Sequence, residues 1–192
     1  MDRGPWIVSC GSVIGLEEAK YTRVEYERRF LVAPETDWRD QVETYRKTFD
    51  DKYLRGTRLR LRFTTNSDSD EGLIKLTKKA ESPSPYFQTI GRILLSTDEY
   101  EFLARLEGDE LRKVRHYHRT AGRVFSIDVF EGELEGLILC ETEAEALNDL
   151  MLAEPPSFVK QEVTEDLFFT GGSLCKVTRI ELMNKLTGLM RV

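Results

Sequence analysis

The chain has 192 residues, enough for one ordinary domain with a short appended segment. Its hydrophobic content of 40% can form a core, and its net charge of −6 argues against non-specific nucleic-acid binding, which requires a basic surface. Charged residues make up 32% of the chain, above the usual quarter or so, so the charge needs a structural or functional explanation.

The cysteines and the apolar runs limit where the protein works. Cys10, Cys140 and Cys175 are odd in number, far apart and without a CxxC pair, which supports neither a disulfide framework nor a zinc site. No apolar run approaches the roughly 18 residues that cross a bilayer, and the N-terminus lacks a signal-peptide pattern. We therefore expect a cytoplasmic protein without a membrane partner.

Strand-like segments recur between turn signals after an N-terminal tail at 1–22. Eight strands are predicted, at 24–32, a stretch ending near 54, and 57–65, 73–79, 88–95, 111–120, 124–130 and 137–145. Residues 66–72 are predicted as a polar hairpin loop and 171–173 as a turn. Helices are expected at 36–43, after the capping box of Ser96 and Glu99, and at 179–190. This pattern predicts an α+β fold, an eight-stranded antiparallel β-barrel with a few peripheral helices.

Charged residues occupy every second position in several strands, so each set shares one face of its strand. The third strand carries only basic residues on that face and the eighth only acidic ones. The sets are Glu25, Glu27 and Arg29; Arg58, Arg60 and Arg62; Lys75 and Lys79; Lys113 and Arg115; Asp128; and Glu141, Glu143 and Glu145. His116 and His118 alternate with the basic residues of their strand and are expected to point outward, away from any metal site.

Two interpretations of this alternation remain open from the residues alone. A half-exposed sheet could turn its charged face to water. A closed sheet could instead turn it inward, where like charges about 7 Å apart along a strand would repel one another. A polyphosphate would neutralise the arginines and lysines, and a divalent cation the glutamates. Grouping of like charges by strand and apolar opposite faces favour the closed sheet.

The segment EYERRFLV at 25–32 resembles the ExExK signature of the CYTH, or triphosphate tunnel metalloenzyme, superfamily. Further segments resemble that family in the expected order, at 52–54, 57–62, 76–79, 111–115, 127–132, 141–143 and 162–166. The resemblance covers roughly residues 24–174. It implies a tunnel domain at 23–174, between the tail and a C-terminal helix at 175–192.

The family implies that the tunnel binds a triphosphate with Mg²⁺ or Mn²⁺. Matching positions assign the metal to Glu25, Glu27, Glu141 and Glu143, with Asp128 as a helper. They assign the phosphate oxygens to Arg29, Arg58, Arg60, Arg62, Lys75, Lys79 and Arg115, and place Tyr53 and Lys113 near the attacking water. The chain departs from the family at Arg29, which replaces lysine, and at Ser126, Ile90 and Arg92, which replace acidic residues.

The leading hypothesis is metal-dependent hydrolysis of a small triphosphate, most simply inorganic tripolyphosphate. Thiamine triphosphate hydrolysis and adenylate cyclase activity are alternatives on the same fold. A non-catalytic module that binds polyphosphate or nucleotide, and a structural sheet protein, are alternatives of other classes. The expected partner is the triphosphate, with no nucleic acid; a homodimer remains an open alternative.

Overall fold

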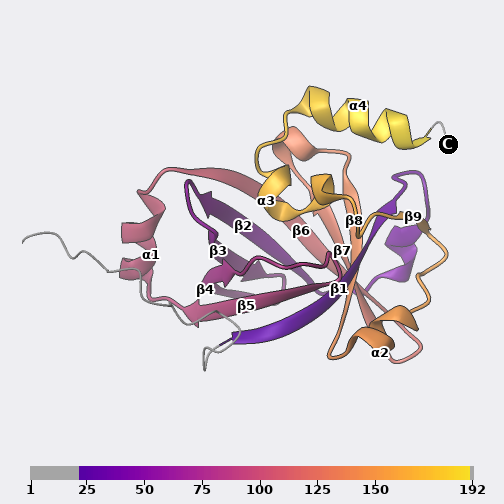
Figure 1. Ribbon diagram of the computed structural model, residues 1–192, viewed down its shortest axis with the longest axis horizontal. Helices are drawn as coiled ribbons and strands as arrows, with labels where there is room; N and C mark the ends of the chain where they lie inside the picture. The colour runs from indigo at the N-terminus through magenta and orange to yellow at the C-terminus, as the bar shows by residue number, and fades with distance from the viewer. Residues whose placement is uncertain (1–21, 191–192) are drawn as a thin grey trace, which may run out of the picture.

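Eight antiparallel strands close into a barrel in the computed structural model, which describes residues 22–190 (Figure 1). Its strands are β1 (Thr22–Val32), β2 (Arg46–Leu54), β3 (Leu59–Asn66), β4 (Ser69–Lys79), β5 (Phe87–Leu94), β6 (Gly108–Thr120), β7 (Arg123–Phe130) and β8 (Ile138–Ala144). Each strand pairs with two neighbours around the ring, and β1 closes it by pairing with both β5 and β8. The predicted barrel is confirmed.

Three predicted elements differ in the structure. The segment predicted as a helix at 36–43 forms only the 3₁₀ turn η2 (Trp38–Gln41), which buries Trp38. The predicted loop at 66–72 is mostly strand, because Asn66 pairs with Ser69 across a tight turn. A ninth strand, β9 (Val159–Glu162), pairs with the end of β1 outside the ring. Its four residues are too few to show a strand pattern in the sequence. The predicted tail lies outside the described residues except for Thr22.

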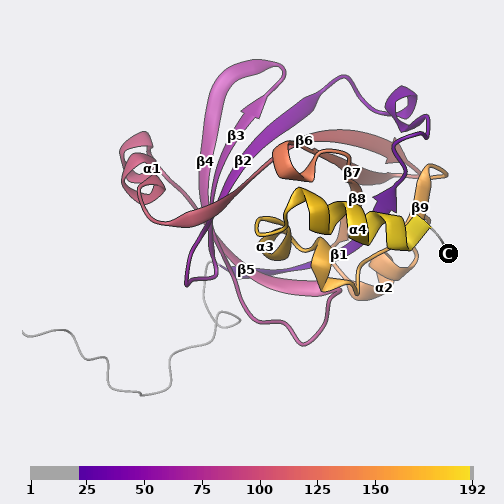
Figure 2. The same cartoon turned by 90° about the horizontal axis from the view of Figure 1, so that it is seen from above.

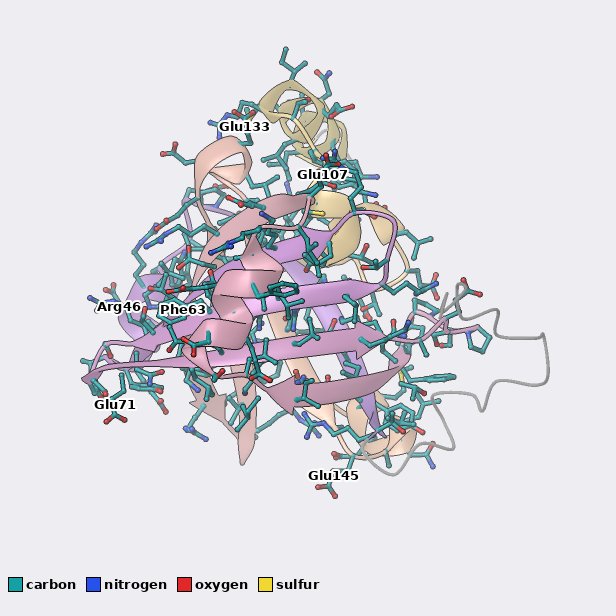
Figure 3. The ribbon with its side chains drawn as sticks, turned by 90° about the vertical axis from the view of Figure 1, so that its left-hand side faces the viewer. Arg46, Phe63, Glu71, Glu107, Glu133 and Glu145 are labelled. Carbon is teal, nitrogen blue, oxygen red and sulfur yellow. The ribbon has the colours of Figure 1, made fainter. Side chains whose placement is uncertain are left out.

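Within the described residues, four helices accompany the barrel: α1 (Thr97–Ala104), α2 (Leu147–Met151), α3 (Gly171–Leu174) and α4 (Arg179–Met190). The capping box of Ser96 and Glu99 is present at the start of α1, as predicted. α1 covers β3 from outside, where Phe63 lies 6.0 Å from Tyr100 between ring centroids (Figure 3). None of the helices in the described part of the chain is long and apolar enough to cross a bilayer.

The outer face of β1, β7 and β8 carries one apolar core. Its buried side chains are Phe30, Val32, Trp38, Phe125, Ile127, Ile138, Cys140 and Phe158. The two histidines join this outer layer, His116 against Trp38 at 5.4 Å and His118 against Phe158 at 5.4 Å between ring centroids. Their predicted outward orientation is confirmed, and the outer layer explains how the apolar strand faces avoid water.

A second apolar core closes one end of the barrel. Inward-facing residues at that end meet the turn η3 (Gly132–Leu134), which connects β7 to β8, and the C-terminal segment, which contains the turn η4 (Leu167–Phe169) and helices α3 and α4 (Figure 2). The contributors include Leu31, Leu111, Phe130 and Leu139 from the strands and Phe169, Leu174, Leu182 and Leu186 from the C-terminal segment. Residues 171–173, predicted as a turn, form α3 within this apolar plug. The charged interior is therefore sealed at one end.

Leu182 is a test of this apolar plug, because it is fully buried within it. Leu182→Ala is expected to lower the free energy of unfolding by about 2–5 kcal/mol, since the substitution leaves a cavity at a packed site. Denaturant titration measures the change. Met183→Ala is the matched control, because the neighbouring Met183 is 44% exposed and should change stability by less than about 0.5 kcal/mol. Equal losses for the two variants would contradict the packing of α4 on the barrel.

Candidate functional site

The charged strand faces point into the barrel, where their side chains contact one another across strands. Arg29 lies opposite Glu141, Arg115 opposite Asp128 and Arg62 opposite Asp51 in the strand register. Each of these three pairs also makes an ion pair. The alternation seen in the sequence therefore builds a charged interior, and the solvated-face interpretation is wrong.

Glu141 lies at the centre of one ion-pair network. Arg29 Nε donates to Glu141 Oε1 at 3.1 Å, and Arg115 Nη2 donates to Oε2 at 2.7 Å. Arg29 also pairs with Glu27 on its own strand. Burial opposes the ionisation of Glu141, but the cations of Lys113, Arg115 and Arg29 hold its pKa far below the usual value. Glu141 is therefore a carboxylate throughout the neutral range, and two arginines already hold it.

Asp128 extends this network toward the plugged end. It is fully buried, and both its oxygens accept from Arg115, each at 2.6 Å. Lys113 also pairs with Asp128, and its ammonium lies 5.3 Å from the ring centroid of Phe130. The structure thus places Asp128 as the partner of two cations, and its predicted metal-helper role stays a prediction.

Asp51 is an interior carboxylate that sequence reasoning missed. Arg62 Nη2 donates to Asp51 Oδ2 at 2.6 Å, and Arg60 Nε lies 3.8 Å from Oδ1. Burial opposes its ionisation, but Arg60 and Arg62 lower the pKa of Asp51 below its usual value. The sequence pattern that could have identified Asp51 is its spacing: it lies two residues before Tyr53 and therefore shares the same strand face.

Tyr53 lies next to this pair and beside the apolar plug. Burial raises the pKa of Tyr53 to about 12, although the positive charge of the nearby Arg60 opposes that rise. The phenol is therefore protonated at neutral pH, which suits a hydrogen-bond donor better than a base.

The wall formed by β4 is basic. Lys75, Thr77 and Lys79 alternate along its inner face, with Lys75 opposite Arg62 and Thr77 opposite Arg60. Burial and neighbouring cations lower the pKa of both lysines. Among the residues from 22 to 190, neither lysine forms an ion pair with a carboxylate within 4.0 Å. The mutual repulsion of these cations would be relieved by a bound anion.

The opposite wall is acidic near the open mouth of the barrel. Glu27 lies opposite Glu143 in the register, and Glu25 accepts from Arg92 at 3.1 Å. Partial loss of hydration raises the pKa of Glu143, and the charges of Glu25 and Glu27 raise it further. A cation placed among these carboxylates would relieve their repulsion.

Divalent metals such as Mg²⁺ and Mn²⁺ prefer oxygen ligands, so the donor chemistry of this acidic wall fits them. As the side chains lie, however, no three acidic, histidine or cysteine residues within the described range converge as a metal-binding group. The carboxylates of Glu27 and Glu141 do not turn toward a shared metal position, because both pair with Arg29. The residue that replaces lysine in the signature therefore competes for two of the predicted ligands.

Arg58 is the one predicted phosphate ligand that lies outside the interior. β3 begins at Leu59, and the Arg58 side chain is 48% exposed, pairing with Glu81 at 2.7 Å and donating to the Lys79 carbonyl at 3.1 Å. The prediction from strand alternation is wrong here because Arg58 lies in the turn before the strand. The other predicted residues, from Glu25 to Glu143, face the interior.

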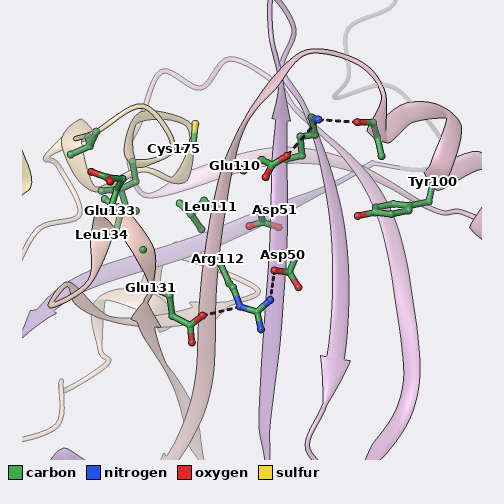
Figure 4. A pocket seen from close by; sticks show the side chains of 15 residues that line it. Asp50, Asp51, Tyr100, Glu110, Leu111, Arg112, Glu131, Glu133, Leu134 and Cys175 are labelled. Carbon is green, nitrogen blue, oxygen red and sulfur yellow. Dashed lines mark hydrogen bonds and ion pairs between the residues drawn. The ribbon is translucent and has the colours of Figure 1, made fainter. Parts of the chain in front are cut away.

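Cavities at the surface of the barrel differ in their surroundings. One of about 660 Å³ is at the open mouth, lined by residues that include Arg115, Tyr117, Ser126 and Glu143. It leads to the charged interior. Another, of about 510 Å³, lies outside the ring between α1 and the C-terminal segment (Figure 4). There Arg112 bridges Asp50 and Glu131 at 2.8 Å each, so its charge is already neutralised. The outer cavity is therefore a poor anion site.

Gly171 of α3 fixes the position of the Tyr53 ring. A Cβ atom at Gly171 would lie 2.1 Å from the Tyr53 hydroxyl oxygen. Gly171→Ala is therefore expected to destabilise the fold by about 1–3 kcal/mol, because the clash forces α3 or the ring to move. Thermal unfolding measures the loss.

Two further variants make this test specific. Gly172→Ala should be neutral, because a Cβ there would have no neighbour within 4 Å. Adding Tyr53→Phe to Gly171→Ala should recover most of the stability, because the nearest remaining ring atom would be 3.1 Å away. Failure of the double variant to recover would mean that the hydroxyl contact does not limit this site.

Comparisons with known proteins agree with this architecture. The sequence is 32% identical over 155 residues to an inorganic triphosphatase of Nitrosomonas europaea, covering 74% of this chain and 90% of the relative. A crystal structure of an inorganic triphosphatase superposes with a TM-score of 0.54 and 26% identity, covering 80% of this chain and 95% of the other. A Pyrococcus horikoshii protein, 18% identical over 84% of this chain and 99% of its own, shares the fold with a TM-score of 0.52. No family model matches the sequence. With the closed charged barrel, these likenesses show that the chain belongs to the CYTH, or triphosphate tunnel metalloenzyme, superfamily.

Proposed function

We propose that this protein hydrolyses a small triphosphate, most simply inorganic tripolyphosphate, with Mg²⁺ or Mn²⁺. The observation that carries the proposal is the division of the barrel interior, which is closed at one end, into a basic wall and an acidic wall. Lys75 and Lys79 form the basic wall, and burial together with the arginines beside them, Arg62 near Lys75 and Arg60 near Lys79, lowers the pKa of both lysines. The relationship to a named inorganic triphosphatase supports the choice of substrate.

The basic residues would bind and orient the phosphate chain. Arginine forks suit phosphate oxygens in a bidentate manner, which applies to Arg60, Arg62 and Arg115. Lysine supplies point charge, which applies to Lys75 and Lys79. The plug excludes bulk water from one end of the barrel, so these charges act in a less polarisable medium than water. Phosphoryl transfer depends mainly on such positioning and electrostatic stabilisation.

The acidic wall would hold the metal through Glu25, Glu27 and Glu143, with Glu141 available if Arg29 turns to the phosphate. A bound metal would neutralise phosphate charge and help orient the attacking water. Tyr53 and Lys113 are proposed to lie beside that water. Because its pKa is about 12, the Tyr53 phenol would donate a hydrogen bond there.

A non-catalytic phosphate-binding role is the second candidate, and one observation favours it. Arg29 pairs with both Glu27 and Glu141, so two predicted metal ligands are engaged within the protein. Such a module would bind tripolyphosphate with little dependence on metal and release no phosphate.

Phosphate release from a panel of substrates separates these possibilities. The panel contains tripolyphosphate, thiamine triphosphate, ATP and pyrophosphate, each with Mg²⁺, with Mn²⁺ and with EDTA. The proposal expects metal-dependent release that is fastest with tripolyphosphate. Cyclic AMP formation from ATP would favour a cyclase, and faster release from thiamine triphosphate would favour that substrate. Binding without release would favour the non-catalytic module.

We also propose that the protein acts in the cytoplasm. Cys140 and Cys175 are both free thiols in the structure, as expected for a protein in a reducing compartment. Cys140 is buried in the outer core, and burial raises its thiol pKa, which makes it inert as a nucleophile.

A further inference from the structure

Thr77 lies at the middle of the basic wall and has no assigned role. It is fully buried, and it faces the interior between Lys75 and Lys79 on β4. In the register it stands opposite Arg60 on β3 and opposite Arg92 on β5. Thr77 is therefore an uncharged hydroxyl within a cluster of cations.

The hydroxyl of Thr77 lacks a hydrogen-bond partner. Within residues 22–190, only three buried side-chain polar atoms have none: Trp38 Nε1, Arg60 Nε and Thr77 Oγ1. Two of the three lie directly opposite each other across β3 and β4, and the third is in the outer core. Arg60 Nε lies 3.8 Å from Asp51 Oδ1, which is too long for a hydrogen bond.

Buried polar atoms in native proteins almost always have partners, so paired exceptions in a charged interior point to a ligand. Both atoms can donate a hydrogen bond, and the residues beside and opposite Thr77 on the inner face are basic, with Asp51 as the acidic neighbour of Arg60. Burial and neighbouring cations lower the pKa of Lys75 and Lys79, so a negative charge beside them is favoured. An oxygen that accepts hydrogen bonds and carries negative charge meets all these conditions, and a phosphoryl oxygen is such an atom.

We infer that Thr77 binds the substrate directly: its hydroxyl donates to a phosphoryl oxygen of the polyphosphate, next to the oxygen bound by Arg60 Nε. The inference rests on the proposed function and adds a neutral donor to its basic wall. A hydroxyl fixes one phosphate oxygen in direction without increasing the repulsion among the surrounding cations.

The test compares Thr77→Val, Thr77→Ser and Thr142→Val by calorimetric titration with tripolyphosphate, by kinetics and by thermal unfolding. Thr77→Val should weaken tripolyphosphate binding and raise KM by about tenfold or more, because a hydrogen bond to a charged acceptor is lost. The melting temperature of the ligand-free variant should stay the same or rise, because the lost hydroxyl had no partner. Thr77→Ser should restore binding.

Thr142→Val is the matched control with the opposite pattern. Thr142 is buried on the outer face, where its hydroxyl donates to the Val124 carbonyl at 3.0 Å. Its loss should lower the melting temperature and leave binding unchanged.

Wild-type affinity in Thr77→Val would overturn the assignment of Thr77 while leaving the proposed function in place. Lower stability of Thr77→Val with unchanged affinity would identify a structural role instead. Absence of tripolyphosphate binding by the wild-type protein would overturn both proposals.

Discussion

Arg60→Ala is expected to lower kcat/KM for tripolyphosphate by about 100-fold or more. Arg60 is buried on the inner face of β3, next to Asp51 and opposite Thr77. A charge-assisted hydrogen bond contributes about 1.5–3 kcal/mol, and an arginine fork that makes two such bonds to phosphate contributes about twice that. Each 1.4 kcal/mol corresponds to about tenfold, so loss of the fork gives the stated decrease.

Arg58→Ala is the matched control for this prediction. Both arginines belong to one alternating series in the sequence, but Arg58 is exposed and pairs with Glu81 outside the interior. Its replacement should leave kcat/KM within about twofold of the wild-type value. Arg60→Ala should still fold, because Asp51 keeps its ion pair with Arg62; thermal unfolding checks this. Equal effects of the two substitutions would place the phosphate site elsewhere.

The sequence predicted the direction of most interior residues because strands have a strict period of two. Glu27, Arg62 and Arg115 all face the interior as that period requires. The period does not show which face is inside. Which face lies inside depends on which face is covered by other parts of the chain. The outer face is covered by segments distant in the sequence, such as η2 with Trp38.

The errors have separate physical causes. Arg58 was misplaced because alternation does not mark the residue at which a strand begins, and Leu59 is that residue. A pattern of like charges does not mark Thr77 or Asp51 as site residues, because Thr77 is neutral and Asp51 is acidic among basic neighbours. The α4 helix was predicted, but an amphipathic pattern does not identify its packing partner, so its closure of the barrel was not foreseen.

The arginine in the signature shows how a local substitution can change the site. Arg29 reaches two carboxylates at once, Glu27 on its own strand and Glu141 on β8. A lysine has no planar fork and could not bridge them in the same geometry. The position therefore links the acidic wall to the network of Arg115 and Asp128. Whether metal joins that wall is tested most directly at a carboxylate outside this network.

Glu143 is that carboxylate, and Glu143→Gln is expected to abolish most metal-dependent phosphate release. It lies opposite Glu27 on the acidic wall and lines the cavity at the mouth. An amide oxygen binds a divalent metal more weakly than a carboxylate, because it lacks the negative charge. A loss of at least about 100-fold at limiting Mg²⁺ or Mn²⁺, partly recovered at high metal concentration, would identify Glu143 as a ligand.

The same substitution should not destabilise the metal-free protein. Partial dehydration and the charges of Glu25 and Glu27 raise the pKa of Glu143, so its ionisation is less favourable in the folded state than in the unfolded one. A raised carboxyl pKa means that the folded state binds more protons, and stability falls as pH rises through the titration of this group. Replacing the carboxyl by a neutral amide removes that penalty at neutral pH. The variant should therefore melt at the wild-type temperature or slightly above it, with the difference vanishing in acid.

Phosphate release across a series of metal concentrations and melting curves from pH 3 to pH 8 measure both effects together. Glu110→Gln is the control, because Glu110 is 75% exposed in side chain and pairs with Lys52 on the outside of β6. Its activity and metal response should match the wild type. If Glu143→Gln keeps the wild-type dependence on metal, the acidic wall does not bind the ion. If the variant also melts at a lower temperature than the wild type at neutral pH, the Glu143 carboxylate has a stabilising partner, which its position near Glu25 and Glu27 does not predict.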